Sequence, residues 1–394
     1  MRTRFAGLVA NVGFPDKPRA MTEREADSSP LDEGGLESGH APLSPLRIKN
    51  RVSVVRLPGH WFVLAMSEEL TRDKPLARTL MSTPLVLFRD AHGVAQTLLD
   101  RCPHRSVPLS EGRVHKDGTL ECGYHGWRFD GGGACRAIPG LKGPCEGKAR
   151  NTPSYPTIEQ QGFVWAYSTP GATPASRPHR FAYADDPRYV TVRQQLDQNG
   201  TLYSCIENAL DVPHTAFLHR GLFRSESRGI TLRVKVKRDK QGVEAEYLGE
   251  SRPPGIMARI LSPTGGEVQH WDRFLLPSIA QVEYRMGDEN HVMADTALTP
   301  IDDFNTRLYG VVSIRTRIPV RGIKPLVTAL ATRVLKQDSY ILEKQTKTIH
   351  AFGGEGFVST EIDVLGKHIW RLLRAAERGD ANVAEEQDEL ELVV

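Results

Sequence analysis

Short apolar runs follow one another closely in the first half of the chain. They lie at residues 61–64, 85–88, 94–99 and 162–167, and glycine, proline or aspartate separates them. Runs of this length at close spacing are typical of short β-strands joined by tight turns. This half therefore predicts a small antiparallel β domain, in which residues 162–167 form the closing strand.

The second half mixes strand-like and helix-like patterns. Residues 231–238 alternate strictly between apolar and charged side chains, and a polar turn leads from them into residues 243–248, which predicts a hairpin. Further strands are expected at residues 274–284, 292–298 and 308–318. A long helical period runs from Pro325 to about Ile349. We therefore expect an α+β fold in which helices cover one face of an antiparallel sheet.

A segment rich in proline, alanine and serine, residues 168–178, separates the two halves and is typical of a linker. The two ends of the chain differ from the rest, since the first is rich in serine, glycine, proline and acids and the last is acidic. We expect the first to be disordered and the last to be frayed. The expected parts are a disordered extension at 1–47, a first domain at 48–168, a linker at 169–180, a second domain at 181–380 and an acidic tail at 381–394.

Composition narrows the class of protein. The formal net charge of the 394 residues is only +3, and no basic block suggests a nucleic-acid partner. No window of eighteen residues is apolar enough to predict a membrane-spanning helix. The five cysteines are an odd number, and the start of the chain lacks a secretory pattern, so we expect reduced thiols and a cytoplasmic protein.

Two cysteines and two histidines alternate at Cys102, His104, Cys122 and His125, in the pattern C-x-H-x17-C-x2-H. In a Rieske [2Fe–2S] cluster, two cysteines bind one iron and two histidines bind the other. A cysteine and a histidine in each short segment let two loops deliver one ligand apiece to each iron. The spacing therefore predicts a Rieske cluster in the first domain.

Zinc and a disulfide are the alternatives for these four residues. Structural zinc sites usually place both cysteines before both histidines, not alternating with them. A disulfide between Cys102 and Cys122 is unexpected in a chain without a secretory signal. The iron–sulfur cluster remains the interpretation that uses all four side chains.

A second group of candidate ligands lies at Asp211, His214 and His219. Glu207, Asp211 and His214 share one narrow stripe of an ideal helix, but His219 lies about 140° further round from His214. A bend or a helix-to-loop break must therefore fall between the two histidines. Two histidines plus one carboxylate form the facial triad of non-haem Fe(II) oxygenases. Taken alone, an aspartate and two histidines at this spacing are more often a solvated helix face. After a Rieske motif a metal site becomes the stronger interpretation, because the cluster would store the electron that the iron site consumes.

The third ligand must come from elsewhere, and we choose Asp338. It lies in the long helical period, and its neighbours three and four residues away are apolar, which places it on the buried face. A buried carboxylate needs a partner, and a metal ion is one. Asp363 and Glu343 remain rival candidates.

With both motifs in this order, the chain resembles the oxygenase α-subunit of Rieske non-haem iron oxygenases over about residues 50–375. The ligands that the resemblance implies are Cys102, His104, Cys122 and His125 for the cluster, and His214, His219 and Asp338 for iron. Asp211 matches the family's bridging aspartate, which hydrogen-bonds an iron-ligand histidine and a cluster histidine of the neighbouring subunit. The layout is similar to the α-only branch that includes vanillate demethylase, dicamba-type monooxygenases and pheophorbide a oxygenase-like proteins.

The resemblance also implies fold, cofactors and partners. It implies a helix-grip-like catalytic domain, a homotrimer, and a mononuclear Fe(II) that uses O2 to hydroxylate, demethylate or desaturate an aromatic or polycyclic small molecule. The sequence has no dinucleotide fingerprint, so electrons from NAD(P)H are expected to arrive through a separate reductase, with or without a ferredoxin.

Two functions from other classes stay open on the sequence. A Rieske electron-transfer protein would carry the cluster but would not need the second group of ligands. A zinc-binding structural module would be colourless, whereas a Rieske protein is brown.

Overall fold

The computed structural model describes residues 56–219, 231–251, 267–287, 290–316, 320–380 and 382–393. The chain divides into Met1–Leu43 and Ser44–Val394, and everything described here belongs to the second unit. The N-terminal extension expected over residues 1–47 lies outside the described residues.

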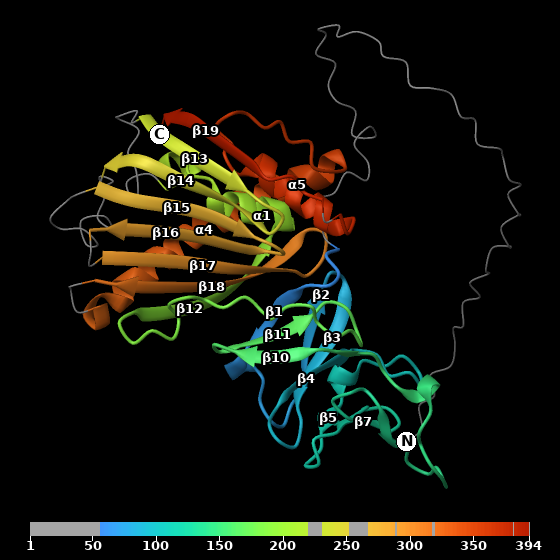
Figure 1. Ribbon diagram of the computed structural model, residues 1–394. Helices are drawn as coiled ribbons and strands as arrows, with labels where there is room; N and C mark the ends of the chain where they lie inside the picture. The colour runs from blue at the N-terminus through green and yellow to red at the C-terminus, as the bar shows by residue number, and fades with distance from the viewer. Residues whose placement is uncertain are drawn as a thin grey trace, which may run out of the picture. The chain divides into compact units, whose positions relative to one another are not determined.

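Three small antiparallel sheets build the first domain (Figure 1). The first sheet contains β1 (Trp61–Met66), β11 (Phe163–Tyr167) and β10 (Thr157–Gln160). The second contains β2 (Leu76–Leu80), β3 (Thr83–Arg89), β4 (Ala95–Leu99) and β9 (Ser154–Tyr155). The third contains β5 (Arg113–Val114), β6 (Leu120–Glu121), β7 (Arg128–Phe129) and β8 (Cys135–Ala137). The four strands expected in this half are β1, β3, β4 and β11, so the small β domain is confirmed.

One antiparallel sheet of eight strands dominates the second domain (Figure 1). Its strands, in spatial order, are β12 (Val190–Asn199), β18 (Asn305–Arg315), β17 (Asn290–Pro300), β16 (Ile279–Met286), β15 (Glu267–Leu275), β14 (Gly242–Ser251), β13 (Thr231–Arg238) and β19 (Glu386–Val393). The expected hairpin is β13 and β14, and the side chain of Asp239 closes its turn by accepting hydrogen bonds from the backbone N–H of Gln241 and Gly242. The single strand expected at residues 274–284 is instead the end of β15 and most of β16. Pro277, which has no N–H for a strand ladder, lies in the turn between them.

Helices pack against one face of this sheet. They are α1 (Leu202–Leu210), α4 (Val320–Phe352) and α5 (Gly366–Glu377), and the short helix α2 (His214–Leu218) follows α1 in the chain. Valines of β13 share a buried cluster with leucines of α1 and α5, whereas Ala297 and Tyr309 on the other face pack with Trp61 and Trp165 of the first domain. The α+β arrangement is therefore as expected, and α4 is longer than the predicted period. No helix among the described residues combines the length and apolarity that crossing a membrane requires.

The acidic tail is not frayed, so this expectation was wrong. Residues 386–393 form strand β19, which pairs antiparallel with β13. Glu389 and Glu391 lie opposite Lys235 and Arg233, so the acidic side chains meet the basic side of β13. Leu392 faces the other way and is buried in the core that the helices share.

This pairing leads to a stability prediction. Leu392→Ala should lower the free energy of unfolding by about 2–5 kcal/mol, because it removes a buried leucine side chain from the core. Val393→Ala is the matched control, since Val393 is 67% exposed and should change little. Urea unfolding of the two variants measures the difference, and equal midpoints would contradict the packing of β19.

Candidate metal centres

Two short loops carry the four ligands expected for a cluster. The first loop follows β4, and its backbone is closed by two hydrogen bonds: Cys102 N–H donates to Val107 O (2.9 Å), and Ser106 N–H donates to Cys102 O (2.9 Å). Ser106 has φ 60°, a left-handed conformation that makes the tight turn possible. His104 therefore lies at the tip of a rigid loop.

The second loop, between β6 and β7, repeats this geometry. Cys122 N–H donates to Trp127 O (2.8 Å), and Gly126 N–H donates to Cys122 O (3.0 Å). Gly126 has φ 69° and occupies the position of Ser106 in the first loop. The two loops differ in where the histidine falls, two residues after Cys102 in one and three residues after Cys122 in the other.

The loop tips bring the four side chains together. Both cysteines are 2% exposed and belong to one buried cluster. The rings of His104 and His125 lie 4.6 Å apart between centroids, and Trp127 stacks on His104 at 4.9 Å and 5°. The cysteine pair thus lies on the inner side and the histidine pair towards the surface, where His125 is exposed.

These residues fit a [2Fe–2S] cluster. The Nδ1 atom of His104 is buried, yet it has no hydrogen-bond partner among the described residues. A buried imidazole nitrogen without a partner is costly unless something else binds it. Two thiolates and two imidazoles are the mixed donor set of a Rieske cluster.

A cluster prediction follows. Cys102→Ala should remove roughly two irons and two acid-labile sulfides per chain, since no other ligand can take its place at the same reach. Cys205→Ala is the control, because Cys205 is also a buried cysteine but lies on α1. Iron and acid-labile sulfide are measured in both variants and in the parent protein. Zinc without labile sulfide in the parent protein would refute a Rieske cluster.

The second group of ligands begins where α1 ends. Thr201 caps the start of α1, and the helix stops at Leu210, so Asp211 has an extended backbone. Pro213 then begins the short helix α2, and His219 follows its last residue with φ −106° and ψ 38°. The chain therefore breaks twice, once at residues 211–213 and once at His219. The second break is the helix-to-loop break that the spacing of the two histidines required.

The two histidines and Asp338 converge on one point. His214 Nε2 and His219 Nε2 lie 3.3 Å apart. Asp338 Oδ1, which comes from α4, lies 3.0 Å from His219 Nε2 and 3.7 Å from His214 Nε2. Among the described residues this oxygen is buried and accepts no hydrogen bond of acceptable geometry. Two imidazole nitrogens and one unsatisfied carboxylate oxygen form the donor set of a facial triad, so the residues fit Fe(II).

Neighbouring oxygens orient both rings. Asp211 O lies 2.5 Å from His214 Nδ1, and Gln337 Oε1 lies 3.0 Å from His219 Nδ1. A carbonyl oxygen can only accept, so each Nδ1 carries the proton and each Nε2 lone pair faces Asp338. Burial lowers the pKa of His214, but the hydrogen bond and charge of Asp211 outweigh it, so that the pKa is raised. Sequence reasoning missed Gln337, because nothing marks a glutamine beside a candidate ligand.

The rival carboxylates lie elsewhere. Glu343, five residues beyond Asp338 on α4, pairs with Lys347 on an exposed face. Asp363 Oδ2 accepts a hydrogen bond from Thr360 N–H (2.6 Å). Within the described ranges, Asp338 is the carboxylate that shares a metal-sized site with both histidines.

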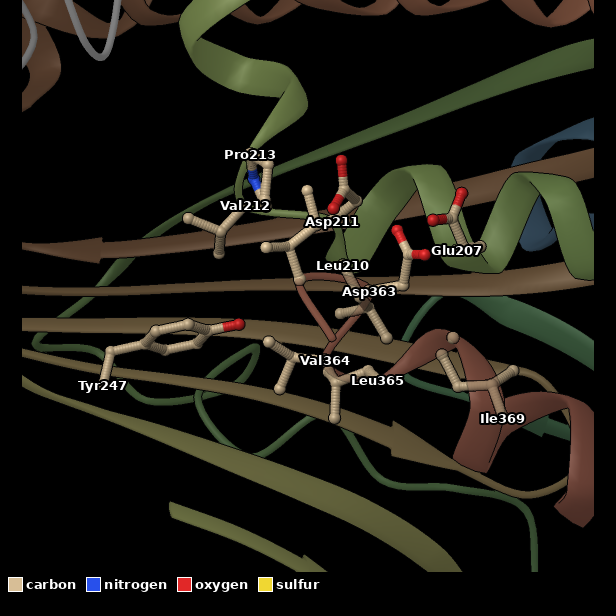
Figure 2. Close-up of a pocket in the computed structure, with 12 residues that line it drawn as sticks. Glu207, Leu210, Asp211, Val212, Pro213, Tyr247, Asp363, Val364, Leu365 and Ile369 are labelled. Atoms are coloured by element: carbon tan, nitrogen blue, oxygen red, sulfur yellow. The ribbon is translucent and has the colours of Figure 1, made fainter. Parts of the chain in front are cut away.

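Asp211 also faces a small cavity, which Figure 2 shows. The carboxylates of Glu207, Asp211 and Asp363 line one side of it, and the hydroxyl of Tyr247 points into it from β14. Burial, together with the negative charges of Asp211 and Asp363, raises the pKa of Glu207 to about 7. The stripe expected for Glu207 and Asp211 therefore points into this cavity, while His214 belongs to the next helix.

Family models match both halves of the chain. The model described as "Rieske [2Fe-2S] domain" matches residues 60–156. The model described as "Vanillate O-demethylase oxygenase C-terminal domain" matches residues 200–379. All four candidate cluster ligands fall within the first match, and both candidate histidines and Asp338 fall within the second.

Individual proteins agree with the family models. The chain is 33% identical over 218 residues to the oxygenase component of dicamba O-demethylase from Stenotrophomonas maltophilia, which covers 54% of this chain and 62% of that protein. It is 35% identical over 219 residues to the chloroplastic pheophorbide a oxygenase of Oryza sativa subsp. japonica, covering 52% and 40%. The match thus spans less than two thirds of either relative. The crystal structure of dicamba monooxygenase bound to 3,6-dichlorosalicylic acid superposes with a TM-score of 0.72 at 26% identity, covering 84% of this chain and 100% of that one.

Proposed function

Because the chain belongs to the Rieske non-haem iron oxygenases, we propose that it is a terminal oxygenase that oxidises an organic small molecule with O2. One observation carries the proposal: Nε2 of His214, Nε2 of His219 and Oδ1 of Asp338 meet in a chain that also holds a Rieske ligand set. An electron carrier needs only the cluster.

Each ligand set has its own task in this proposal. Cys102, His104, Cys122 and His125 hold the [2Fe–2S] cluster, and His214, His219 and Asp338 hold Fe(II). When bound, the cluster supplies electrons one at a time and the iron activates O2 for oxidation of the substrate. The three-residue iron set leaves coordination positions open, and Asp211 and Gln337 keep the two imidazole rings aimed at the site.

We place the electron route between neighbouring subunits of a homotrimer. His125 is exposed, and Tyr124 beside it is 62% exposed, so the histidine side of the cluster is accessible to another chain. Asp211 touches His214 and faces the cavity of Figure 2, and its carboxylate is the polar group that would accept a hydrogen bond from the neighbour's cluster histidine.

Two inactive variants test this arrangement. His125→Ala chains lack a cluster ligand and Asp338→Ala chains lack an iron ligand, so each homo-oligomer should be inactive. Co-expressed chains should regain a substantial fraction of activity, because an intact cluster of one subunit then neighbours an intact iron site of another. Mixing the two purified homo-oligomers without exchange is the control. Electron transfer between subunits would be refuted if verified mixed oligomers were no more active than the single variants.

The sheet supports an apolar substrate. Asp272, Val282, Ala294 and Val312 stand side by side across β15, β16, β17 and β18. They share the sheet face that packs on the helices, and the three apolar members are only partly buried. An apolar, partly open wall of this kind suits an aromatic or polycyclic molecule. The names of the relatives, dicamba O-demethylase and pheophorbide a oxygenase, are consistent with that class. The oxidation would be a hydroxylation, demethylation or desaturation.

The electrons would come from NAD(P)H through a separate reductase, with or without a ferredoxin, as in a multi-component system. We place the protein in the cytoplasm, where such a reductase operates and where free thiols stay reduced.

Substrate-dependent O2 uptake tests the function. The purified protein, with a surrogate reductase and NADH, should consume O2 faster with some members of a pooled set of aromatic and polycyclic compounds, and mass spectrometry should find an oxidised product. The Asp338→Ala protein should keep its reducible cluster but lose that response. Two results together would favour the electron-transfer alternative. The parent protein's cluster would be reduced and reoxidised normally while no compound is oxidised, and Asp338→Ala would not change that behaviour.

A further inference from the structure

Two thiols that neither metal centre uses lie close together in the first domain. Cys135 on β8 is 2% exposed, and Cys145, ten residues later, is partly exposed. Cys145 Sγ lies 3.3 Å from the carbonyl oxygen of Cys135 and donates to it. The Sγ of Cys135 instead lies 3.8 Å from the carbonyl oxygen of Ala137. Neither Cys135 nor Cys145 is in a disulfide.

The segment between the thiols has unusual backbone freedom. Gly140 and Gly143 have φ of 80° and 144°, a backbone conformation that residues with a side chain rarely adopt. A Cβ added at Gly140 or Gly143 would meet no atom within 4 Å. Because little surrounds this segment, small backbone movements can bring the two sulfurs to bonding distance and angle.

The same segment covers a ligand loop of the cluster. A Cβ on Gly126, in the second loop, would lie 2.9 Å from Pro139 Cγ. Cys135 is a member of the buried cluster that contains Cys102 and Cys122, and Ile138 and Cys145 pack against it. A covalent link between Cys135 and Cys145 would therefore tie the cover of the cluster to β8.

We propose that Cys135 and Cys145 are a peroxide-responsive pair that hydrogen peroxide converts into a disulfide, which an external dithiol reduces back to two thiols. The proposal goes beyond the oxygenase function and needs only the two thiols and the oxidant. Hydrogen peroxide is the two-electron, two-proton reduction product of O2, so an oxygenase that gives O2 two electrons without oxidising its substrate releases it.

The reaction has two balanced steps. The sulfur of Cys145, the more accessible thiol, attacks one peroxide oxygen; the O–O bond breaks, Cys145 becomes a sulfenic acid, and one water leaves. The sulfur of Cys135 then displaces the hydroxyl group, the S–S bond forms, and a second water leaves. The two sulfurs lose two electrons in total, and both peroxide oxygens end as water.

The roles of the two residues follow from their surroundings. Cys145 can meet peroxide because it is partly exposed. Cys135 is only 2% exposed, so peroxide from the solvent reaches its sulfur less readily than that of Cys145. Cys135 is therefore the resolving thiol, which reacts once the sulfenic acid has formed next to it.

Peptide mapping tests the proposal on the cluster-loaded, full-length protein. Trypsin cleaves after Arg128, Arg136, Lys142 and Lys148, so Cys135 and Cys145 fall in separate peptides, 129–136 and 143–148, each with one cysteine. After treatment with equimolar hydrogen peroxide and alkylation, these two peptides should run as one cross-linked species that dithiothreitol separates. The visible spectrum of the cluster should be unchanged at that stage.

Two variants complete the test. Cys145→Ser should abolish the cross-link and make the cluster spectrum bleach several-fold faster under peroxide, because the ligand thiolates then meet the oxidant first. Cys205→Ser should behave like the parent protein. The proposal is overturned if peroxide leaves both peptides unlinked, if it produces only sulfinic or sulfonic acid, or if Cys145→Ser and the parent bleach at the same rate.

Discussion

Asp338→Ala should reduce substrate oxidation by more than about 100-fold while leaving the cluster intact. Changes to residues that merely support a metal ligand already cost about 10- to 100-fold, and Asp338 is the residue that we propose as the carboxylate ligand itself. Its Oδ1 lies 3.0 Å and 3.7 Å from the two histidine nitrogens, whereas the cluster uses ligands from a different domain. Iron analysis should therefore show loss of the mononuclear iron alone, with an unchanged Rieske spectrum.

Matched carboxylate variants make this result specific. Glu343→Ala removes an acidic side chain from the same helix, one that pairs with Lys347, and should keep both iron and activity. Asp363→Ala removes the other rival, which caps the backbone at Thr360. If Asp363→Ala emptied the site and Asp338→Ala did not, the assignment of the third ligand would be wrong.

Much of the fold was predictable because it depends on local patterns. Alternation in residues 231–238 forces one side of β13 into the core, and the polar turn that follows permits a hairpin, so sequence alone placed β13 and β14. The acidic tail was misjudged for a related reason. A run of acids looks solvated by itself, but here β13, more than 150 residues earlier in the chain, presents Arg233 and Lys235 opposite it. Such complementarity is invisible until the two strands are known to be neighbours.

The candidate sites divide in the same way. Spacing singled out both candidate ligand loops and the two candidate histidines of the iron site, because each pair is close in sequence. Asp338 followed from a buried carboxylate on a helical stripe, although that argument left two rivals until the structure brought α4 beside α2. Gln337 could not be predicted, since its role depends on the ring orientation of His219. The contact of Cys135 with Cys145 depends on a glycine-rich segment whose path the sequence does not specify.

Asp211→Asn should separate electron delivery from metal binding. Asparagine keeps the shape of the side chain but removes the charge that lies 3.3 Å from His214 Nδ1. The backbone carbonyl that orients the ring remains, so both metals should stay bound and dithionite should still reduce the cluster. Product formation in a single turnover of the pre-reduced protein should nevertheless fall by about 10- to 100-fold, the usual cost of losing a supporting carboxylate.

The control for this variant lies in the same cavity. Glu207→Gln neutralises another carboxylate that lines the cavity beside Asp211. Among the hydrogen bonds described, His214 has bonds to Asp211 and none to Glu207. The single-turnover yield of Glu207→Gln should therefore stay close to that of the parent protein. Because the protein is reduced beforehand, no reductase is needed, and a docking defect cannot explain a loss. If Asp211→Asn formed product at the parent's yield, the electron would have to reach the iron by another route. The bridging role of Asp211 between subunits would then have to be abandoned, whereas the ligand assignments of both metal centres would stand.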